Sequence, residues 1–283
     1  METNINKEYL CELLDKGETY RSIGKILNLH HNTIYYYVHK YGLDEHTRFY
    51  SQKQHSNSNY FEIIDTKEKA YLLGFILADG SICDDYLDIA VSTSDRVVVD
   101  FIAKTLSSKV TESTKLDKSK RIFPKVRTCL RVPHLNKHVG GNKKEDRHYP
   151  RVRKELEQYL LRGFFDADGC LSWGYRKDRG VEHKRMWCFI DFANHLKCLS
   201  GVQKLLFNTL SIPTIVRPRN DGRMYNLRFD SKRNVLKFLH YIYEDEEFMI
   251  LDRKYNKYKA MCLELGEFGE GAISHNTEPS RAI

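Results

Sequence analysis

Two stretches of the chain share one pattern of apolar and polar positions. Residues 72–80 read LLGFILADG and residues 161–169 read LRGFFDADG, and each runs through apolar side chains to a closing Ala-Asp-Gly. The two aspartates, Asp79 and Asp168, lie 89 residues apart. A motif that recurs at domain-scale spacing predicts two related halves.

Each copy of the motif is predicted to be a buried helix. Asp65 and Glu68 have the spacing of a capping box, which opens the first helix near Thr66 and leaves room for about three turns. Gly80 and Gly169 are expected to end the two helices in the left-handed conformation, which glycine adopts without a steric penalty.

Small residues mark one face of each predicted helix. Gly74 and Ala78 are four apart, as are Gly163 and Ala167, and residues at this spacing are neighbours on a helix surface. Such a lane lets a second helix approach closely. If the two motif helices pack side by side, their closing aspartates also face each other.

Paired aspartates at two helix ends carry an electrostatic cost. Each carboxylate faces the negative end of its helix dipole, and two carboxylates about 5 Å apart repel by roughly 3 kcal/mol at an effective dielectric constant of about 20. A divalent cation between Asp79 and Asp168 relieves this repulsion, and hard oxygen ligands favour Mg²⁺. The alternative is that each aspartate only ends a turn before a glycine.

The paired motif resembles that of the single-chain LAGLIDADG homing endonucleases, over roughly residues 60–262. The first copy departs from the family at Leu77, where the second keeps an acidic residue, Asp166. The resemblance implies an α+β fold of two pseudo-symmetric αββαββα halves that form a DNA-binding saddle, and a monomer that cuts double-stranded DNA with Mg²⁺; Mn²⁺ and Ca²⁺ are alternative occupants. The metal ligands that it implies are Asp79 and Asp168, helped by the Gly80 and Gly169 carbonyls.

The resemblance also implies a basic residue beside each active site. In the second half, the segment LDRKYNKY makes Lys254 the candidate for this basic residue. In the first half, GGNKKEDRHYP makes Lys144 the candidate, with Lys143 as the alternative. Ordinary solvated lysines are the alternative. Thr93 and Asn194, at strand ends after each motif, are candidates for positioning solvent.

The amino-acid composition predicts a polyanionic partner and an intracellular location. The 283 residues have room for one large domain and a small one, and 41% of them are hydrophobic. A net charge of +8 favours nucleic acid as the partner. The seven cysteines form no CxxC pair, which is typical of reduced structural thiols in a cytoplasmic protein. The sequence shows no apolar run of membrane length and no signal pattern.

Residues 1–43 are predicted to be a separate unit of three helices. Asn6 caps the first, which ends at Gly17, Thr19 caps the second, Asn28 makes a turn, and residues 30–41 form the third. The predicted core is Leu10, Leu13, Leu14, Ile23, Ile26, Leu27, Ile34, Val38 and Tyr41.

The segment YRSIGKILNLHHNTIYYYV resembles the helix-turn-helix DNA-binding domains of resolvases. The resemblance places Asn32 and Tyr36 at base edges in the major groove, with Arg21, Thr33 and Tyr35 on phosphates. The alternative is a small helical bundle that binds protein.

The rest of the chain repeats strands and helices. A linker, 44–60, leads to the first half, 61–150, with strands near 87–92 and 125–132 around a helix at 96–106. The second half, 151–265, has a strand at 185–192, a helix at 196–210, a hairpin of 214–219 and 223–230 around Asn220-Asp221-Gly222, and helices at 231–243 and 246–264. The tail, 266–283, is expected to be disordered.

The predicted basic strand faces carry Lys125, Arg127 and Arg131 in the first half and Arg217, Arg219, Arg223 and Arg228 in the second. An ordinary solvated strand face is the alternative.

Three functions remain in view. The first is a site-specific DNA endonuclease whose helix-turn-helix lengthens the contacted site. The second is a regulator that binds DNA without cutting it, against which the two retained aspartates argue. The third is an intron RNA maturase built on the same fold.

Overall fold

A computed structural model describes the residues 5–16, 18–46, 59–83, 86–116, 122–176, 185–219, 222–249 and 251–266. The chain divides into two units by its internal contacts, one of Met1–Ile63 with Ser81–Asn136 and one of Ile64–Gly80 with Lys137–Ile283. Within the described residues, every helix is too short or too polar to cross a membrane.

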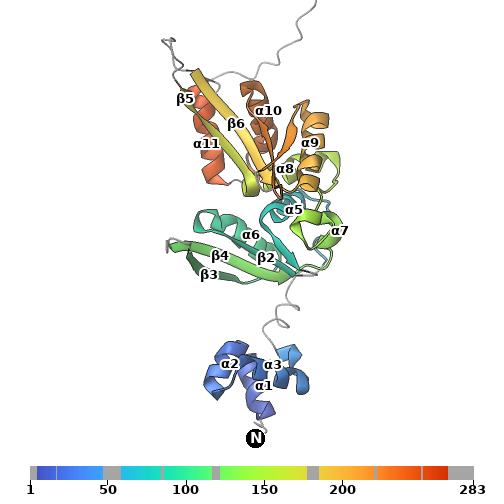
Figure 1. The fold of residues 1–283 in the computed structure, drawn as a ribbon, viewed down its shortest axis with the longest axis vertical. Coiled ribbons are helices and arrows are strands. Elements are labelled where there is room, and N and C mark those ends of the chain that lie inside the picture. Colours follow the sequence, from blue (N-terminus) through green and yellow to red (C-terminus); the bar gives the residue numbers. More distant parts are fainter. Residues whose placement is uncertain are drawn as a thin grey trace, which may run out of the picture. The chain divides into compact units, whose positions relative to one another are not determined.

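The N-terminal module has three helices, α1 (Lys7–Asp15), α2 (Tyr20–Leu27) and α3 (His31–Lys40), and a short 3₁₀ turn, η1 (Asp44–His46) (Figure 1). The predicted caps are confirmed: the Asn6 side chain accepts a hydrogen bond from the Tyr9 N–H at 2.8 Å, and Thr19 caps α2 in the same way. Asn28 takes the left-handed conformation expected of it, with φ of 52°.

The core of this module is mostly as predicted. Leu10, Leu13, Leu14, Ile23, Ile34 and Val38 are buried. The prediction for Ile26 is wrong, because this side chain is 49% exposed, while Tyr37 is buried instead. The predicted end of the first helix at Gly17 lies outside the described residues.

The first sheet is antiparallel, with strand order β1-β2-β4-β3. Alternating apolar residues give this sheet one buried face, formed by Leu87, Ile89 and Val91 in β2 and by Val126 and Leu130 in β4. Helix α6 packs against these two strands. The elements are β1 (Ser81–Cys83), β2 (Tyr86–Ser92), η2 (Thr93–Asp95), α6 (Arg96–Thr105), β3 (Val110–Leu116), β4 (Ile122–Arg131) and α7 (Leu135–Val139).

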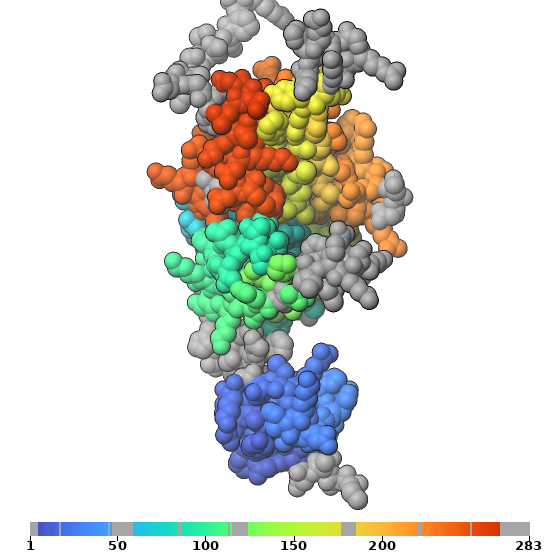
Figure 2. Space-filling model, turned by 90° about the vertical axis from the view of Figure 1, so that its left-hand side faces the viewer, coloured from blue at the N-terminus to red at the C-terminus, as the bar shows by residue number. Residues whose placement is uncertain are grey.

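The second sheet repeats this topology, with strand order β5-β6-β8-β7. Helices α8 to α10 pack against β6, and α11 lies beside β5 (Figure 2). The Trp173 indole of β5 donates to the Lys257 carbonyl of α11 at 3.2 Å. The elements are α8 (Glu157–Asp168), β5 (Gly169–Arg176), β6 (Arg185–Asn194), α9 (Leu196–Leu210), β7 (Ile215–Pro218), β8 (Tyr225–Phe229), α10 (Lys232–Tyr243) and α11 (Asp252–Glu264).

The predicted α+β class and the αββαββα order of both halves are thus confirmed. The last helix begins at Asp252, later than the expected residue 246. The predicted hairpin turn falls on Asn220 and Asp221, and the tail falls on residues 267–283, all outside the described residues.

The first motif helix, α5 (Lys67–Asp79), packs directly on α8 through the predicted glycines. A Cβ atom on Gly74 would lie 2.0 Å from the Leu160 carbonyl oxygen, and one on Gly163 would lie 2.0 Å from the Tyr71 carbonyl oxygen. The two backbones therefore touch where each helix lacks a side chain. This packing groups α5 with the second half of the chain; the expected boundaries, 61–150 and 151–265, stay a prediction.

Two details at the ends of these helices differ from expectation. Thr66, rather than Asp65, caps α5 by accepting from the Lys69 N–H, and Asp65 instead pairs with the Lys69 ammonium. Gly80 and Gly169 are not left-handed: their φ values are −67° and −73°. Each glycine leads straight into a strand, so its backbone is already extended.

We predict that Gly163→Ala lowers the free energy of unfolding by about 3 kcal/mol or more, the upper end of overpacking costs, because the blocking atom is backbone. Urea denaturation followed by tryptophan fluorescence measures it, since Trp173 and Trp187 both lie in this unit. The control is Asn208→Ala on the exposed face of α9, expected within about 0.5 kcal/mol of wild type. Equal stability of the two variants would contradict the close contact.

Candidate active site

The closing aspartates of α5 and α8 form an electrostatic pair. Asp79 is exposed and Asp168 is half-buried. Burial, and after it the negative charge of Asp79, raise the pKa of Asp168 to about 6. The Asn194 amide, which donates to Asp168 Oδ2 at 2.5 Å, acts in the opposite direction. The structure therefore brings the two predicted aspartates within reach of each other.

Both nominated lysines lie at the ends of the motif helices. Lys254 is 6% exposed, and its Nζ donates to the Gly169 carbonyl at 2.7 Å and to the Phe165 carbonyl. Lys144 Nζ donates to the Ala78 carbonyl at 3.0 Å. Cations at helix C-termini interact favourably with the dipole. Both also favour the ionised form of Asp168, so they oppose the rise in its pKa.

Arg147 is a residue of this region that sequence reasoning missed. Its side chain is 2% exposed, and it donates to the Gly80 carbonyl at 2.8 Å and to the Asn142 carbonyl at 2.9 Å. Burial lowers the pKa of its guanidinium. A signal was present: Asp-Arg-x-Tyr occurs at 146–149 and again at 252–255. In the second copy Arg253 donates to the Asp166 carbonyl at 3.4 Å.

The donor set fits a hard divalent cation. The two carboxylates offer oxygen ligands, and the pKa of Asp168 stays raised by burial and by the charge of Asp79 although Lys144 and Lys254 oppose the rise. The Gly80 and Gly169 carbonyls already accept bonds from Arg147 and Lys254. Each carbonyl oxygen has a second lone pair, so their part in metal binding stays a prediction.

Asp166 makes the two helix ends unequal. It is fully buried, and the Tyr71 hydroxyl of α5 donates to its Oδ2 at 2.9 Å. Burial raises its pKa to about 6, while the charge of Lys254 opposes the rise. Leu77 stands at the corresponding place in α5. The acidic residue of the second motif thus joins the two helices by a polar bond.

The exposed face of the second sheet is basic and aromatic. In β6, Arg185, Trp187 and Phe189 alternate with buried residues, and Trp187 stacks beside Phe189. The Arg228 guanidinium lies 3.6 Å from the centre of the Phe189 ring. Arg176, directly across from Arg185, extends this face. Sequence reasoning missed Arg176 and Arg185, although the alternation in 185–192 pointed to the latter.

The other predicted basic positions lie on exposed strand faces. Arg217 is exposed in β7, and Arg219 and Arg223 are exposed at the end of its hairpin. In the first sheet Lys125, Arg127 and Arg131 lie opposite the buried face of β4, as expected. The Arg127 guanidinium donates two hydrogen bonds to the Asp88 carboxylate, at 2.6 and 2.8 Å, so the positive charge of this face is partly neutralised.

The helix-turn-helix candidates also reach solvent. Arg21, Asn32, Tyr35 and Tyr36 are exposed, and Thr33 is half-buried. Tyr35 packs edge-on against His39 along α3. These side chains are therefore accessible to a partner, and their contact with DNA stays a prediction.

A model of the LAGLIDADG-like domain family matches residues 155–243, which span α8 to α10. Residues 155–243 form a LAGLIDADG-like domain. This domain holds Asp168, Asp166 and Asn194, so the carboxylate at the end of α8 belongs to it. Comparison with curated proteins gives no match.

Solved structures with LAGLIDADG folds are similar to the chain at low identity. The I-LtrWI LAGLIDADG homing endonuclease bound to target DNA has 11% identity and a TM-score of 0.49, covering 75% of this chain and 92% of its own. I-SmaMI bound to cleaved DNA has 11% identity and a TM-score of 0.48, covering 71% and 88%. I-SmaMI bound to an uncleaved target with calcium ions has 9% identity and a TM-score of 0.47, covering 72% and 93%.

We predict that Tyr71→Phe lowers the free energy of unfolding by about 1–3 kcal/mol, because it removes a hydrogen bond from the buried Asp166 carboxyl. Urea denaturation measures the loss. Tyr175→Phe is the matched control: its hydroxyl bonds to Glu264 at an exposed position, and its loss should cost about 0.5 kcal/mol or less. Equal costs for the two variants would show that the buried bond adds nothing.

Proposed function

We propose that the chain is a site-specific DNA endonuclease of the two-motif LAGLIDADG type, which makes Mg²⁺-dependent double-strand breaks. One observation carries the proposal: Asp79 and Asp168 end two helices in direct backbone contact, and the charge of Asp79 contributes to the raised pKa of Asp168. The family match to residues 155–243 supports it.

Phosphodiester hydrolysis needs an activated water and relief of the charge that builds on the phosphate. Asp79 and Asp168 are the residues that would hold Mg²⁺, which supplies both when bound. Asn194 fixes one oxygen of Asp168, so that the carboxylate is oriented before any substrate arrives. Lys144 and Lys254 bring positive charge to the helix ends, which favours the anionic form of Asp168 and attracts a phosphate.

The exposed face of the second sheet provides the main DNA contact in this proposal. Arg176, Arg185, Arg217 and Arg228 supply charge for the phosphate backbone. The stacking of Arg228 over Phe189 holds its guanidinium in a fixed plane, a geometry suited to bidentate contact with phosphate or guanine. The N-terminal module extends recognition through Arg21, Asn32, Thr33, Tyr35 and Tyr36.

We predict that Asp79→Asn and Asp168→Asn each reduce cleavage of the target DNA below detection while leaving its binding within about threefold, because the amide keeps the shape but loses the charge that holds a metal. A target-cleavage assay with Mg²⁺, repeated with EDTA, measures this. Asp100→Asn, on the exposed face of α6, is the control and should cut normally.

The same assay separates the alternatives. Tight DNA binding with no cutting by the wild-type chain on its footprinted site, with or without Mg²⁺, would identify a regulator. Rescue of intron splicing without DNA cutting would identify a maturase. Cutting that survives either aspartate substitution would refute the assigned chemistry.

We predict that Arg217→Ala and Arg228→Ala each weaken binding and make the slope of log affinity against log salt shallower by about 0.9, the value for one lost phosphate contact. Fluorescence anisotropy on labelled duplex across a salt series measures it. Lys204→Ala, on an exposed position of α9, is the control and should leave the slope unchanged. Equal slopes in all three variants would show that this face of the sheet does not contact the DNA.

A further inference from the structure

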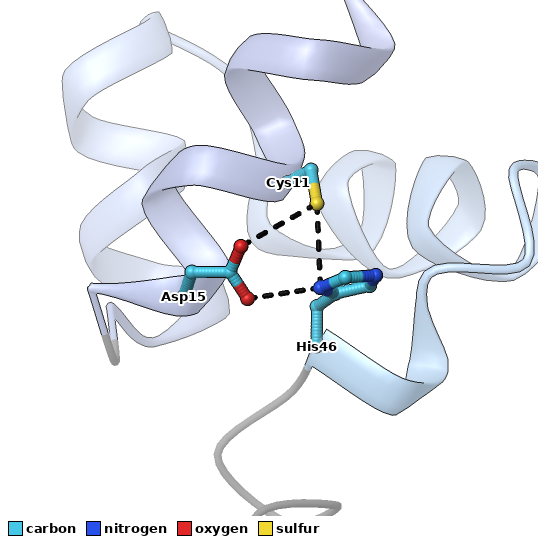
Figure 3. A group of neighbouring side chains, drawn as sticks. All are labelled: Cys11, Asp15 and His46. Carbon is cyan, nitrogen blue, oxygen red and sulfur yellow. Dashed lines mark hydrogen bonds and ion pairs between the residues drawn. The ribbon is translucent and has the colours of Figure 1, made fainter.

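Three side chains of different ligand types converge in the N-terminal module (Figure 3). Cys11 and Asp15 stand four apart on one face of α1, and His46 comes from η1. The His46 Nδ1 lies 3.3 Å from Cys11 Sγ and 2.9 Å from Asp15 Oδ1, and Cys11 Sγ lies 3.7 Å from Asp15 Oδ2. A thiol, an imidazole and a carboxylate thus point at one place.

We propose that Cys11, Asp15 and His46 bind a Zn²⁺ ion. In a tetrahedral zinc site, bonds of about 2.3 Å to sulfur and about 2.0–2.2 Å to nitrogen and oxygen hold the ligand atoms about 3.3–3.6 Å apart. The His46 Nδ1 lies 3.3 Å from Cys11 Sγ and 2.9 Å from Asp15 Oδ1, each within about 0.4 Å of this range, and the second carboxylate oxygen, Oδ2, lies 3.7 Å from the sulfur. Small rotations of the side chains complete the geometry.

The chemistry of the set selects zinc over the cation proposed for the endonuclease site. Thiolate and imidazole ligands suit zinc, whereas Mg²⁺ takes oxygen ligands. Cys11 is half-buried, and Asp15 and His46 are exposed, so the site opens to solvent and a water completes the tetrahedron. The three residues line a single groove together with the oppositely charged Lys7, Glu8, Glu12 and Lys16, of which Lys16 pairs with Glu12 at 2.6 Å.

The geometry argues against a catalytic Cys-His-Asp relay. In such a relay the histidine faces the nucleophile with one ring nitrogen and the carboxylate with the other. Here the same nitrogen, Nδ1 of His46, faces both Cys11 and Asp15. Convergence of all three groups on one point is the arrangement that a shared ion requires.

A zinc ion at this point ties the two ends of the module together. His46 follows the turn at Leu43, which is buried in the module core, and the ion would bind this exit segment to α1. Domains of about 40 residues rarely bury enough apolar surface to be stable unaided. A zinc site is therefore expected to hold the module folded and to orient the chain where it leaves α3.

The test uses the full-length chain, stripped of metal and titrated with Co²⁺ and then Zn²⁺ in the presence of excess Mg²⁺. We expect one Co²⁺ per chain with the absorption band of a cobalt–thiolate bond, and its displacement by Zn²⁺. Cys11→Ser should abolish the band and weaken zinc affinity by more than the roughly 10- to 100-fold that loss of an outer partner costs. His46→Ala and Asp15→Asn should weaken zinc affinity as well.

Cys83→Ser, at an exposed cysteine of β1, is the matched control and should keep both the band and the affinity. Circular dichroism checks that each variant is folded. No cobalt–thiolate band in the wild type, or a band that persists in Cys11→Ser, overturns the proposal. Target cleavage is measured in parallel, so loss of zinc binding and loss of the nuclease activity are told apart.

Discussion

The structure depends on one contact, the crossing of α5 and α8 where each helix lacks a side chain. Gly74 and Gly163 let the backbone of one helix meet that of the other, and any Cβ atom there would overlap a carbonyl oxygen. Because both helices are stiff, this contact fixes where their last residues lie. Asp79 and Asp168 are placed together by a constraint several residues away from them.

Bringing two carboxylates together at helix ends is unfavourable, and the surrounding residues show how the chain tolerates it. Lys254, Lys144 and Arg147 each donate to carbonyls at those ends, which satisfies groups that the helices leave unpaired. Asp168 still keeps a raised pKa. In our account the remaining charge is what a divalent cation binds to.

The two helix ends are related but unequal. Lys254 is buried and reaches two carbonyls of the second motif, whereas Lys144 is exposed and reaches one of the first. Asp166 adds a buried charge on the second side, with Leu77 in its place on the first. A chain that carries two motifs is free to let each diverge, so in the proposed endonuclease the two halves need not cut at equal rates.

Much of this was readable from the sequence, because the relevant signals are local. The repeated motif, the alternation in β2, β4 and β6, and the caps at Asn6 and Thr19 depend on neighbours within a few residues. Arg147 was missed because its partners, such as Gly80, are brought to it only by the fold. His46 meets Cys11 across 35 residues without a recognisable spacing. The left-handed ending expected of Gly80 and Gly169 failed because the strands that follow them begin at once.

The central claim is that Asp79 and Asp168 jointly hold a metal ion, and a change of ligand type tests it most directly. Asp168→Cys replaces a hard oxygen ligand with a thiolate, which prefers softer cations. The account predicts that this variant cuts target DNA poorly with Mg²⁺ and regains cutting when Cd²⁺ is added, while the wild type gains nothing from Cd²⁺. Equal metal preference in the two proteins would contradict it.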